Sequence, residues 1–413
     1  MKTSILQHSF LASLLFIPLL WSCQKNSENL PTNPVQINLT LKQASLVTSE
    51  NTFAYDLFRY MNLSAGDQNT IISPLSVSYA LSMTVNGAAN ATADSMLKAL
   101  RVSDISISDL NKSYKNLTSA LLSVDSRVLM EIANSVWTEK SFTVKQPFID
   151  TLTGYYDAQA RSFDINDPTA PQEINQWISD HTNGYIKNMI DQLDNKTVML
   201  IINAIYFKGL WKGKFDSNAT TSRTFTQPGG STEEVPTMHQ TETQNIYLGN
   251  GFGMVELPYG QGNFVMDIIL PDNNDLSAVS ASLTASDLAT WASAMTFKKV
   301  DLYLPKFKYG FKVNMNDILT SMGMGIAFTD AADFSNISDI PLLINKVLHQ
   351  AFIETDEQGT VAAAATVVEI GPTMVGPTDP VSFDVNHQFI YIIREVTTNS
   401  VIFMGKVTDP LAQ

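Results

Sequence analysis

Few residues of this 413-residue sequence have the types and spacing that an active site requires. A hydrolase needs a base beside a nucleophile, and the histidines in the body of the chain that could serve are His181, His239, His349 and His387. The number of histidines alone does not exclude a hydrolase triad. However, none of the four lies in a nucleophile elbow, H-E-x-x-H, P-loop or C-x-x-C pattern. The glycine-rich "GNGFG" at 249–253 precedes the strand-like "MVELPY", so it predicts a hairpin turn and not a dinucleotide loop. We therefore predict a protein that is not an enzyme and that uses no cofactor or metal ion.

Cys23 is the sole cysteine and lies at the end of an apolar N-terminal run. Lys2 precedes this run, which is too short and too interrupted for a membrane span and is typical of a secretory signal. The residues before Cys23 resemble a bacterial lipoprotein signal, in which the thiol is acylated, although Trp21 departs from the usual small residue. We expect a removed signal at 1–22 and a lipidated cysteine with a polar tether at 23–45; an unprocessed or conventionally cleaved signal is the alternative.

The lipid anchor predicts attachment to a membrane and a place in the bacterial cell envelope, at the outer membrane or the cell surface. The formal net charge of −14 repels nucleic-acid phosphates, and no Lys/Arg cluster forms an exception, so nucleic acid is not an expected partner. Apolar residues make up 44% of the chain, ample for a core, and no second cysteine exists for a disulfide. Without a further linker or repeat, residues 46–413 are expected to form one domain.

The segment "ETDEQGTVAAAATVVEIGPTMVGPTDP" at 354–380 is the most unusual part of the chain. As an extended strand, residues 360–368 carry only small or β-branched side chains and no charge, so they could enter a sheet without burying an ion. No proline interrupts the run before Pro372, so each residue can donate its N–H to a ladder. Alanine also favours helix, and the residues alone leave open a buried strand or short helix before an ordinary loop.

The elements that position these residues divide the chain into two halves. Helical spacing appears at 51–61 and 73–88, the second with Ser73 as N-cap and Pro74 at the first helical position. Four β-branched and aromatic segments, several apolar on both faces, predict buried strands at 197–211, 264–272, 299–311 and 389–407. The class is mixed α and β without a regular βαβ alternation.

The segment "KVLHQAFIETDEQGTVAAAATVV" at 346–368 resembles the strand, hinge and proximal reactive loop of the serpins. "TIISPLSVSYALSMTVNGA", "IANSVW", "TNGYIKNMI", "LIINAIYFKGLWKGKF", "VELPY", "LPKFK" and "FIYIIREVTTNSVIFMGKVTDP" are similar to serpin segments in serpin order, over roughly 46–411. The resemblance implies the serpin fold, with about nine helices, three β-sheets and an exposed reactive-centre loop at about 357–380. It also implies a monomer that forms a covalent acyl-enzyme with a target serine protease and traps it as the cleaved loop inserts into the central sheet.

The resemblance implies roles for individual residues. Gly359 matches the hinge glycine and Thr360 the first side chain to be buried. The full hinge comprises Glu357, Gly359, Thr360, Val361, Ala362, Ala363, Ala364, Ala365 and Thr366. A polar cluster beneath the central strands (the shutter) matches Ser73, Ser76, Asn203 and His349, and the region where insertion begins (the breach) matches Trp211, Lys306 and Glu357. We expect a Lys306–Glu357 ion pair there.

Counting 17 residues from Glu357 places the scissile bond at Thr373–Met374, with Met374–Val375 as the alternative. The loop is a few residues longer than usual, and Gln388 stands where many serpins carry proline. No Lys or Arg lies between Glu357 and Arg394, so a trypsin-like target is disfavoured and elastase-like or subtilisin-like serine proteases fit better, together with some cysteine proteases.

The sequence leaves two functions open. The first is a suicide-substrate inhibitor of serine proteases, favoured by the uncharged, proline-free hinge. The second is a non-inhibitory serpin that acts as a binding or chaperone module, which usually has bulky, charged or proline residues in the hinge. An inhibitor would hold the protease in a covalent complex after the loop is cleaved, whereas a binding or chaperone module would release an active protease.

Overall fold

The computed structural model describes residues 33–360 and 379–412, all of which belong to one compact unit, Thr32–Gln413. The predicted sites Cys23, Val361, Ala362, Ala363, Ala364, Ala365, Thr366, Thr373, Met374 and Val375 lie outside the described residues.

Nine α-helices form within the described residues, and six of them precede the first long run of strands. Their bounds are α1 Leu41–Ala65, α2 Pro74–Val85, α3 Asn90–Ala99, α4 Ile107–Ser123, α5 Gln146–Tyr156, α6 Ala170–Asp180, α7 Ser277–Ser282, α8 Ala285–Ser293 and α9 Asn316–Leu319. Ser73 caps α2 by accepting the Ser76 N–H at 3.2 Å, with Pro74 in the first turn, so the predicted start of this helix is confirmed.

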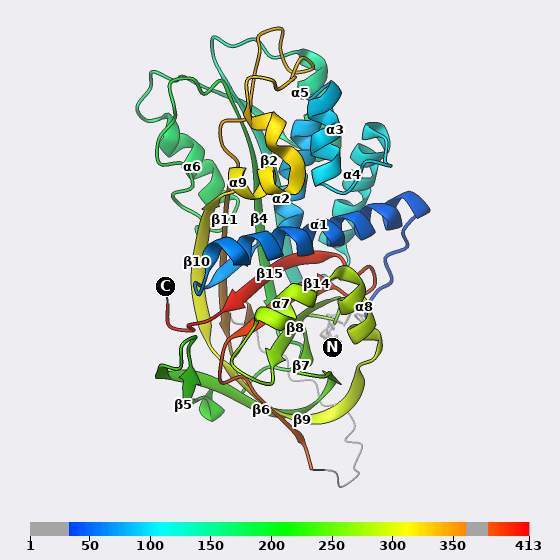
Figure 1. Cartoon of the computed structure of the whole chain (residues 1–413), viewed down its shortest axis with the longest axis vertical. Coiled ribbons are helices and arrows are strands. Elements are labelled where there is room, and N and C mark those ends of the chain that lie inside the picture. Colours follow the sequence, from blue (N-terminus) through cyan, green and yellow to red (C-terminus); the bar gives the residue numbers. More distant parts are fainter. Residues whose placement is uncertain (1–32, 361–378, 413) are drawn as a thin grey trace, which may run out of the picture. The chain divides into compact units, whose positions relative to one another are not determined.

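A nine-stranded sheet fills the lower half of the molecule in Figure 1, in the order β1-β15-β14-β8-β7-β6-β9-β13, with β5 paired to β6. Its strands are β1 Thr70–Ile72, β5 Thr221–Thr226, β6 Thr232–Leu248, β7 Phe252–Pro258, β8 Phe264–Pro271, β9 Thr296–Pro305, β13 Val381–Asp384, β14 Phe389–Glu395 and β15 Val401–Val407. Every residue of β14 and β15 is buried, as the two-sided apolar pattern predicts.

The strands expected as a third sheet are continuous with this one. The long strand β6 pairs with β5 near its start, with β9 along its middle and with β7 at its end, so one ladder passes into the next without a break. The predicted hairpin at 249–253 is the turn between β6 and β7, where Gly251 has φ +92°. The mixed α and β class is confirmed.

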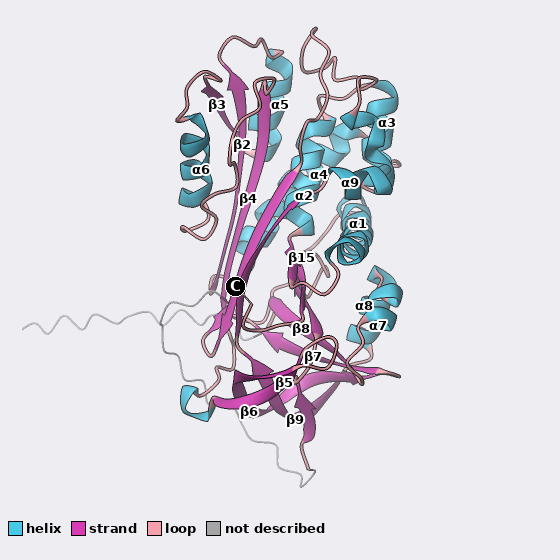
Figure 2. Ribbon diagram, turned by 60° about the vertical axis from the view of Figure 1, so that its left-hand side comes forward, coloured by secondary structure: helices cyan, strands magenta, loops and turns pink. Residues whose placement is uncertain are grey.

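A six-stranded sheet of long strands has the order β10-β11-β12-β4-β2-β3. Its strands are β2 Val128–Glu139, β3 Gln159–Phe163, β4 Met199–Leu210, β10 Phe307–Asn314, β11 Leu348–Asp356 and β12 Gly359–Thr360. Figure 2 shows α6 on one face of this sheet and α2 on the other. Apolar residues of α6 such as Ile174 and Trp177 share a buried cluster with Ile202 and Ala204 of β4, so burial fixes α6 against the sheet.

Residues 33–40, called here the N-terminal strap, run along the folded body before α1. The Val35 N–H donates to the Asn263 Oδ1 and the Asn263 Nδ2 donates to the Val35 carbonyl, both at 2.8 Å, so one side-chain amide pairs with the strap as a strand would. Ile37 is buried and its N–H donates to the Thr397 Oγ1 at 3.1 Å. Part of the predicted tether is thus packed, and α1 begins at Leu41, where Thr40 and Gln43 form a capping box.

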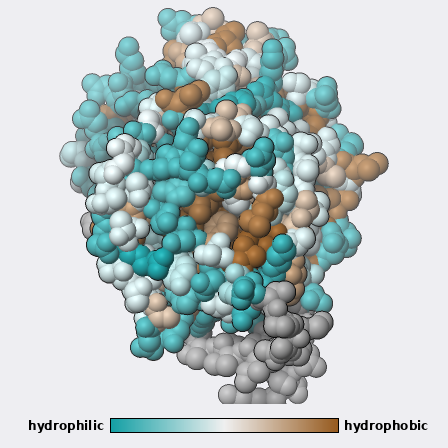
Figure 3. Space-filling model, turned by 60° about the horizontal axis from the view of Figure 1, so that its bottom comes forward, coloured by the Kyte–Doolittle hydropathy of each residue, from teal (hydrophilic) through white to brown (hydrophobic). Residues whose placement is uncertain are grey.

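One face of the molecule mixes hydrophilic and hydrophobic residues (Figure 3). Figure 3 views the molecule from the end that carries β6 and β9, where hydrophilic residues predominate and hydrophobic residues are exposed between them. Among the described residues, no helix combines the length and apolarity that a membrane crossing would need.

Candidate functional site

The hinge forms a strand inside the six-stranded sheet. β12 lies between β4 and β11: Thr360 pairs with Gly209 and Thr355, and Gly359 pairs with Leu210 and Asp356. Both pairings are antiparallel. Two residues of the predicted hinge therefore already occupy a central position at one end of this sheet.

Gly359 is required where it lies because two backbones meet. A Cβ at this position would lie 2.1 Å from the Gly209 carbonyl oxygen and 2.7 Å from the Leu210 Cα, and φ is +150°. These are backbone atoms of a central strand, so they cannot move aside to relieve the clash as a flexible side chain could. The predicted hinge glycine thus allows the chain to enter between two strands.

Thr360 is buried, with 3% of its surface exposed. Its hydroxyl lies 2.5 Å from the Tyr259 hydroxyl and 3.5 Å from the Thr355 hydroxyl. Tyr259 stacks on Trp211 with ring centroids 4.5 Å apart and an interplanar angle of 11°, and burial raises its pKa far above the usual value. The Trp211 Nε1 donates to the Asp356 carbonyl at 2.9 Å, so this pair of rings supports both the turn and the first inserted side chain.

The predicted Lys306–Glu357 ion pair forms, with the Lys306 Nζ 2.8 Å from the Glu357 Oε2. The Thr220 hydroxyl donates to the other carboxylate oxygen at 2.8 Å. Burial raises the pKa of Glu357, but hydrogen bonds from Lys306, its own backbone and Thr220 outweigh it, and the net result is a lowered pKa. Because Lys306 is 37% exposed, we expect a contribution of only about 0–1 kcal/mol to stability.

The predicted polar cluster lies beneath the sheet in two connected groups. In one, the Ser73 backbone N–H donates to the His349 Nε2 at 3.1 Å. In the other, the Ser76 hydroxyl donates to the Asn203 Oδ1, and the Asn203 Nδ2 donates to the Asn134 Oδ1 at 2.6 Å. The N-cap bond between Ser73 and Ser76 joins the groups across the first turn of α2.

His349 is neutral in this arrangement. Burial lowers its pKa to about 4, and its Nε2 accepts a hydrogen bond, which a protonated ring could not do. His349 lies on β11 and Asn203 on β4, so the two side chains lie on strands that flank the line along which β12 runs.

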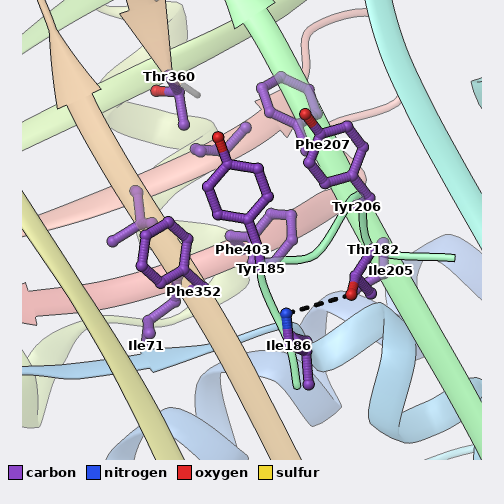
Figure 4. Close-up of a pocket in the computed structure, with 12 residues that line it drawn as sticks. Ile71, Thr182, Tyr185, Ile186, Ile205, Tyr206, Phe207, Phe352, Thr360 and Phe403 are labelled. Carbon is purple, nitrogen blue, oxygen red and sulfur yellow. Dashed lines mark hydrogen bonds between the residues drawn. The ribbon is translucent and has the colours of Figure 1, made fainter. Parts of the chain in front are cut away.

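A gap between β4 and β11 continues beyond β12. In the described part of the chain, β4 pairs with β12 and β2, and β11 pairs with β12 and β10, so no ladder joins β4 directly to β11. Figure 4 shows the cavity that this leaves, with Thr360 at one end. Its lining residues come from both faces of the sheet and are Ile71, Thr182, Tyr185, Ile186, Ile205, Tyr206, Phe207, Phe352, Ile353, Thr360, Ile393 and Phe403.

The other histidines have structural partners. His181 stacks on Trp177, His239 lies 2.8 Å from Asp301 and stacks on Tyr303, and the His387 Nε2 lies 2.8 Å from the Pro271 carbonyl. No group of three or more His, Cys, Asp or Glu side chains within residues 33–360 and 379–412 could hold a metal ion.

Sequence reasoning missed three residues of the site: Asn134, Tyr185 and Tyr259. All three lie inside segments that carried the resemblance, "IANSVW", "TNGYIKNMI" and "VELPY". The signal was therefore present, but their roles depend on which strands they face.

Comparison with known proteins agrees with this architecture. The family model described as serpin (serine protease inhibitor) matches residues 48–410. An uncharacterized serpin-like protein of Thermococcus kodakarensis is 32% identical, over 92% of this chain and 89% of its own length. Alpha-1-antichymotrypsin of Pongo abelii is 32% identical, over 94% and 93%. The structure of human thyroxine-binding globulin superposes with a TM-score of 0.82 at 26% identity, covering 90% of this chain and all of that one.

Proposed function

The chain belongs to the serpin family, and from this premise we propose that it is a suicide-substrate inhibitor of serine proteases. The chain is similar both to alpha-1-antichymotrypsin and to thyroxine-binding globulin. One name refers to a protease and the other to a bound hormone, so membership of the family does not decide between inhibition and binding. One observation favours inhibition: β12 pairs with both β4 and β11 at one end of the gap between these strands.

The register of β12 defines how the cleaved loop would continue. Each further loop residue would pair with the preceding residue of β4, so Val361 would face Lys208 and Ile370 would face Met199, the first residue of that strand. The proline-free run thus spans the whole length of β4, and Pro372 falls beyond its start. The loop composition and the strand length agree.

The inserted strand would also complete the polar cluster. By the same register Thr366 would lie between Asn203 of β4 and His349 of β11, on the face of Thr360. A hydroxyl that can donate and accept would then join the two groups that the gap separates. Alanines at the intervening positions bury without a charge or a large volume.

In the proposed reaction a serine of the target attacks the scissile carbonyl, the new N-terminus departs, and an ester joins the protease to the loop. Insertion then moves the ester to the far end of the sheet before water hydrolyses it. We propose Thr373–Met374 as the scissile bond, with Met374–Val375 as the alternative, and elastase-like or subtilisin-like targets because no basic residue precedes either bond. Cysteine proteases that accept the same residues are further candidates.

The test is to mix the purified full chain, in mild detergent, with pancreatic-type elastase or subtilisin and to analyse the products by denaturing electrophoresis and intact mass. We expect a denaturant-stable complex and a released C-terminal peptide whose mass identifies the scissile bond. Thr360→Arg is the control, because a buried guanidinium would block insertion while the loop is still cleaved. If several apolar-specific proteases cut the wild-type loop and remain fully active, inhibition is wrong and the binding or chaperone function stands.

We also propose that Cys23 carries a lipid that holds the protein at the outer membrane or cell surface. The support is the apolar run that ends at this sole cysteine. In a bacterial host fed an alkyne-labelled fatty acid, the wild type should become labelled and fractionate with membranes, whereas Cys23→Ser should do neither. Equal labelling of the two forms would contradict the proposal.

A further inference from the structure

The gap between β4 and β11 is spanned by one aromatic side chain that belongs to neither strand. Tyr185 lies in the segment that connects α6 to β4. Its ring centroid lies 5.8 Å from that of Tyr206 on β4, with the rings stacked at 24°, and 4.9 Å from that of Phe352 on β11, at 33°. Figure 4 shows the Tyr185 ring between the two strands, pointing toward Thr360.

The connecting segment holds Tyr185 in this position. The Thr182 hydroxyl donates to the Ile178 carbonyl of α6 at 2.8 Å and accepts the Ile186 N–H at 3.2 Å. Asn183 and Gly184 both have positive φ, +49° and +79°, and this turn directs the next side chain toward the sheet. Ile186 is buried against α6 and β4 directly after it, so Tyr185 is fixed on both sides.

The electrostatic surroundings also favour an uncharged ring here. Burial raises the pKa of Tyr185, and Glu354 raises it further, while Lys308 acts in the opposite direction. Lys308 and Glu354 form an ion pair at 3.2 Å on neighbouring strands. Tyr185 therefore stays neutral at physiological pH and contacts the strands through its ring.

Tyr185 occupies the path of the loop. Continuing the register of β12, the residue that would pair with both Tyr206 and Phe352 is Ala363. This is the position where the Tyr185 ring now lies between the same two partners. Thr360 lies in the sheet while Tyr185 is in place, but by this register insertion as far as Ala363 would require Tyr185 to leave.

We propose that Tyr185 is a clasp: it holds β4 and β11 together across the gap, lies on the path of the inserting loop at the position of Ala363, and limits the rate of loop insertion by its own displacement. This inference rests on the proposed function for its biological role, but the clasp itself can be measured without a protease. Tyr185 is a positioning residue, since it touches neither the scissile bond nor the target.

The experiment follows the annealing of a synthetic peptide, "VAAAATVVEIGPT" (residues 361–373), labelled at its N-terminus, to the purified full chain. The peptide fills the gap as the loop would, and native electrophoresis separates bound from free protein. Tyr185→Ala should anneal faster by about tenfold, as expected for the loss of two aromatic contacts. Tyr185→Phe should retain the wild-type rate, because the ring and not the hydroxyl makes both contacts. Tyr247→Ala is the matched control, because Tyr247 also packs on two aromatic rings, Phe252 and Trp291, but outside the six-stranded sheet.

A second measurement separates a clasp from a merely structural residue. After cleavage and insertion Tyr185 has left the gap, so Tyr185→Ala and the wild type should unfold at the same temperature in the cleaved form. Equal annealing rates for the wild type and Tyr185→Ala, or an equal loss of stability in the native and cleaved forms, would overturn the clasp. If the wild type traps no protease yet the annealing rates differ as stated, the proposed function is wrong and the clasp stands.

Discussion

At the scale of single residues, the hinge depends on the absence of a side chain at Gly359. We expect Gly359→Ala to lose about 1–3 kcal/mol of native stability, the usual range for strained backbone, because its methyl group would lie 2.1 Å from the Gly209 oxygen. Relief of this clash should expel β12 and expose Trp211, which a red shift of tryptophan emission would detect. Gly310→Ala on β10 is the control, because a Cβ there lies 3.8 Å from its nearest neighbours. Equal emission spectra for Gly359→Ala and the wild type would refute the expectation.

Two buried ionisable residues oppose each other in the response to pH. Burial lowers the pKa of His349 from 6.5 to about 4, so the native state binds fewer protons than the unfolded state and stability falls as pH falls from 6.5 toward 4. Glu50 behaves in the opposite way. Burial raises its pKa from 4.5 to about 7 despite hydrogen bonds from Ser78 and Tyr114, so stability falls as pH rises from 4.5 to 7.

The two effects should oppose each other in the wild type between pH 4.5 and 6.5, so substitution of either residue should reveal the pH dependence due to the other. From these pKa values each effect is about 3 kcal/mol over its full range. We expect the urea midpoint of His349→Gln, relative to the wild type, to fall as pH rises from 5 to 6.5, and that of Glu50→Gln to rise. Identical pH dependence in all three proteins would show that these groups titrate alike in the folded and unfolded states.

At the scale of elements, the register of β12 assigns Thr366 to a position between Asn203 and His349 in the inserted state. Thr366→Val keeps the shape and removes the hydroxyl, so the cleaved form should lose roughly 0.5–1.5 kcal/mol for each hydrogen bond that the Thr366 hydroxyl would make. The native form of the same variant is the control and should unfold as the wild type does, since Asn203 and His349 have separate partners there. A loss confined to the native form would contradict the register.

The sequence predicts most elements because their signals are local. The apolar pattern of 197–211 and the Ser73–Pro74 cap specify β4 and α2 before any tertiary contact is known. The sequence does not predict that β4 and β11 stand apart, that β12 already lies between them, or that the polar cluster divides between Ser73 and Ser76. These features depend on how strands that are distant in the sequence pair with each other. The apolar pattern of one segment does not specify which other segment it pairs with.

At the scale of the whole molecule, cleavage of the loop should stabilise the fold. Insertion of about ten residues, Val361–Ile370, each contributing roughly 1 kcal/mol net by hydrogen bonding, should raise the thermal midpoint on the order of 10–20 °C. Calorimetry of the chain before and after limited digestion by subtilisin would measure the difference. Thr360→Arg, cut at the same bond, should gain nothing. A wild-type midpoint that does not change on cleavage would show that the loop stays outside the sheet.

The N-terminal strap joins the proposed anchor to the folded body by contacts outside the six-stranded sheet. Its partners Asn263 and Thr397 adjoin β8 and β14, strands of the nine-stranded sheet, so we expect these contacts to persist if the loop widens the six-stranded sheet. If the protein traps proteases as proposed and Cys23 is anchored, each captured protease would remain where it was caught, joined to an inhibitor that could not act twice. Each molecule would then inactivate one protease molecule, and the inhibitory capacity at the cell surface would fall until new protein is synthesised.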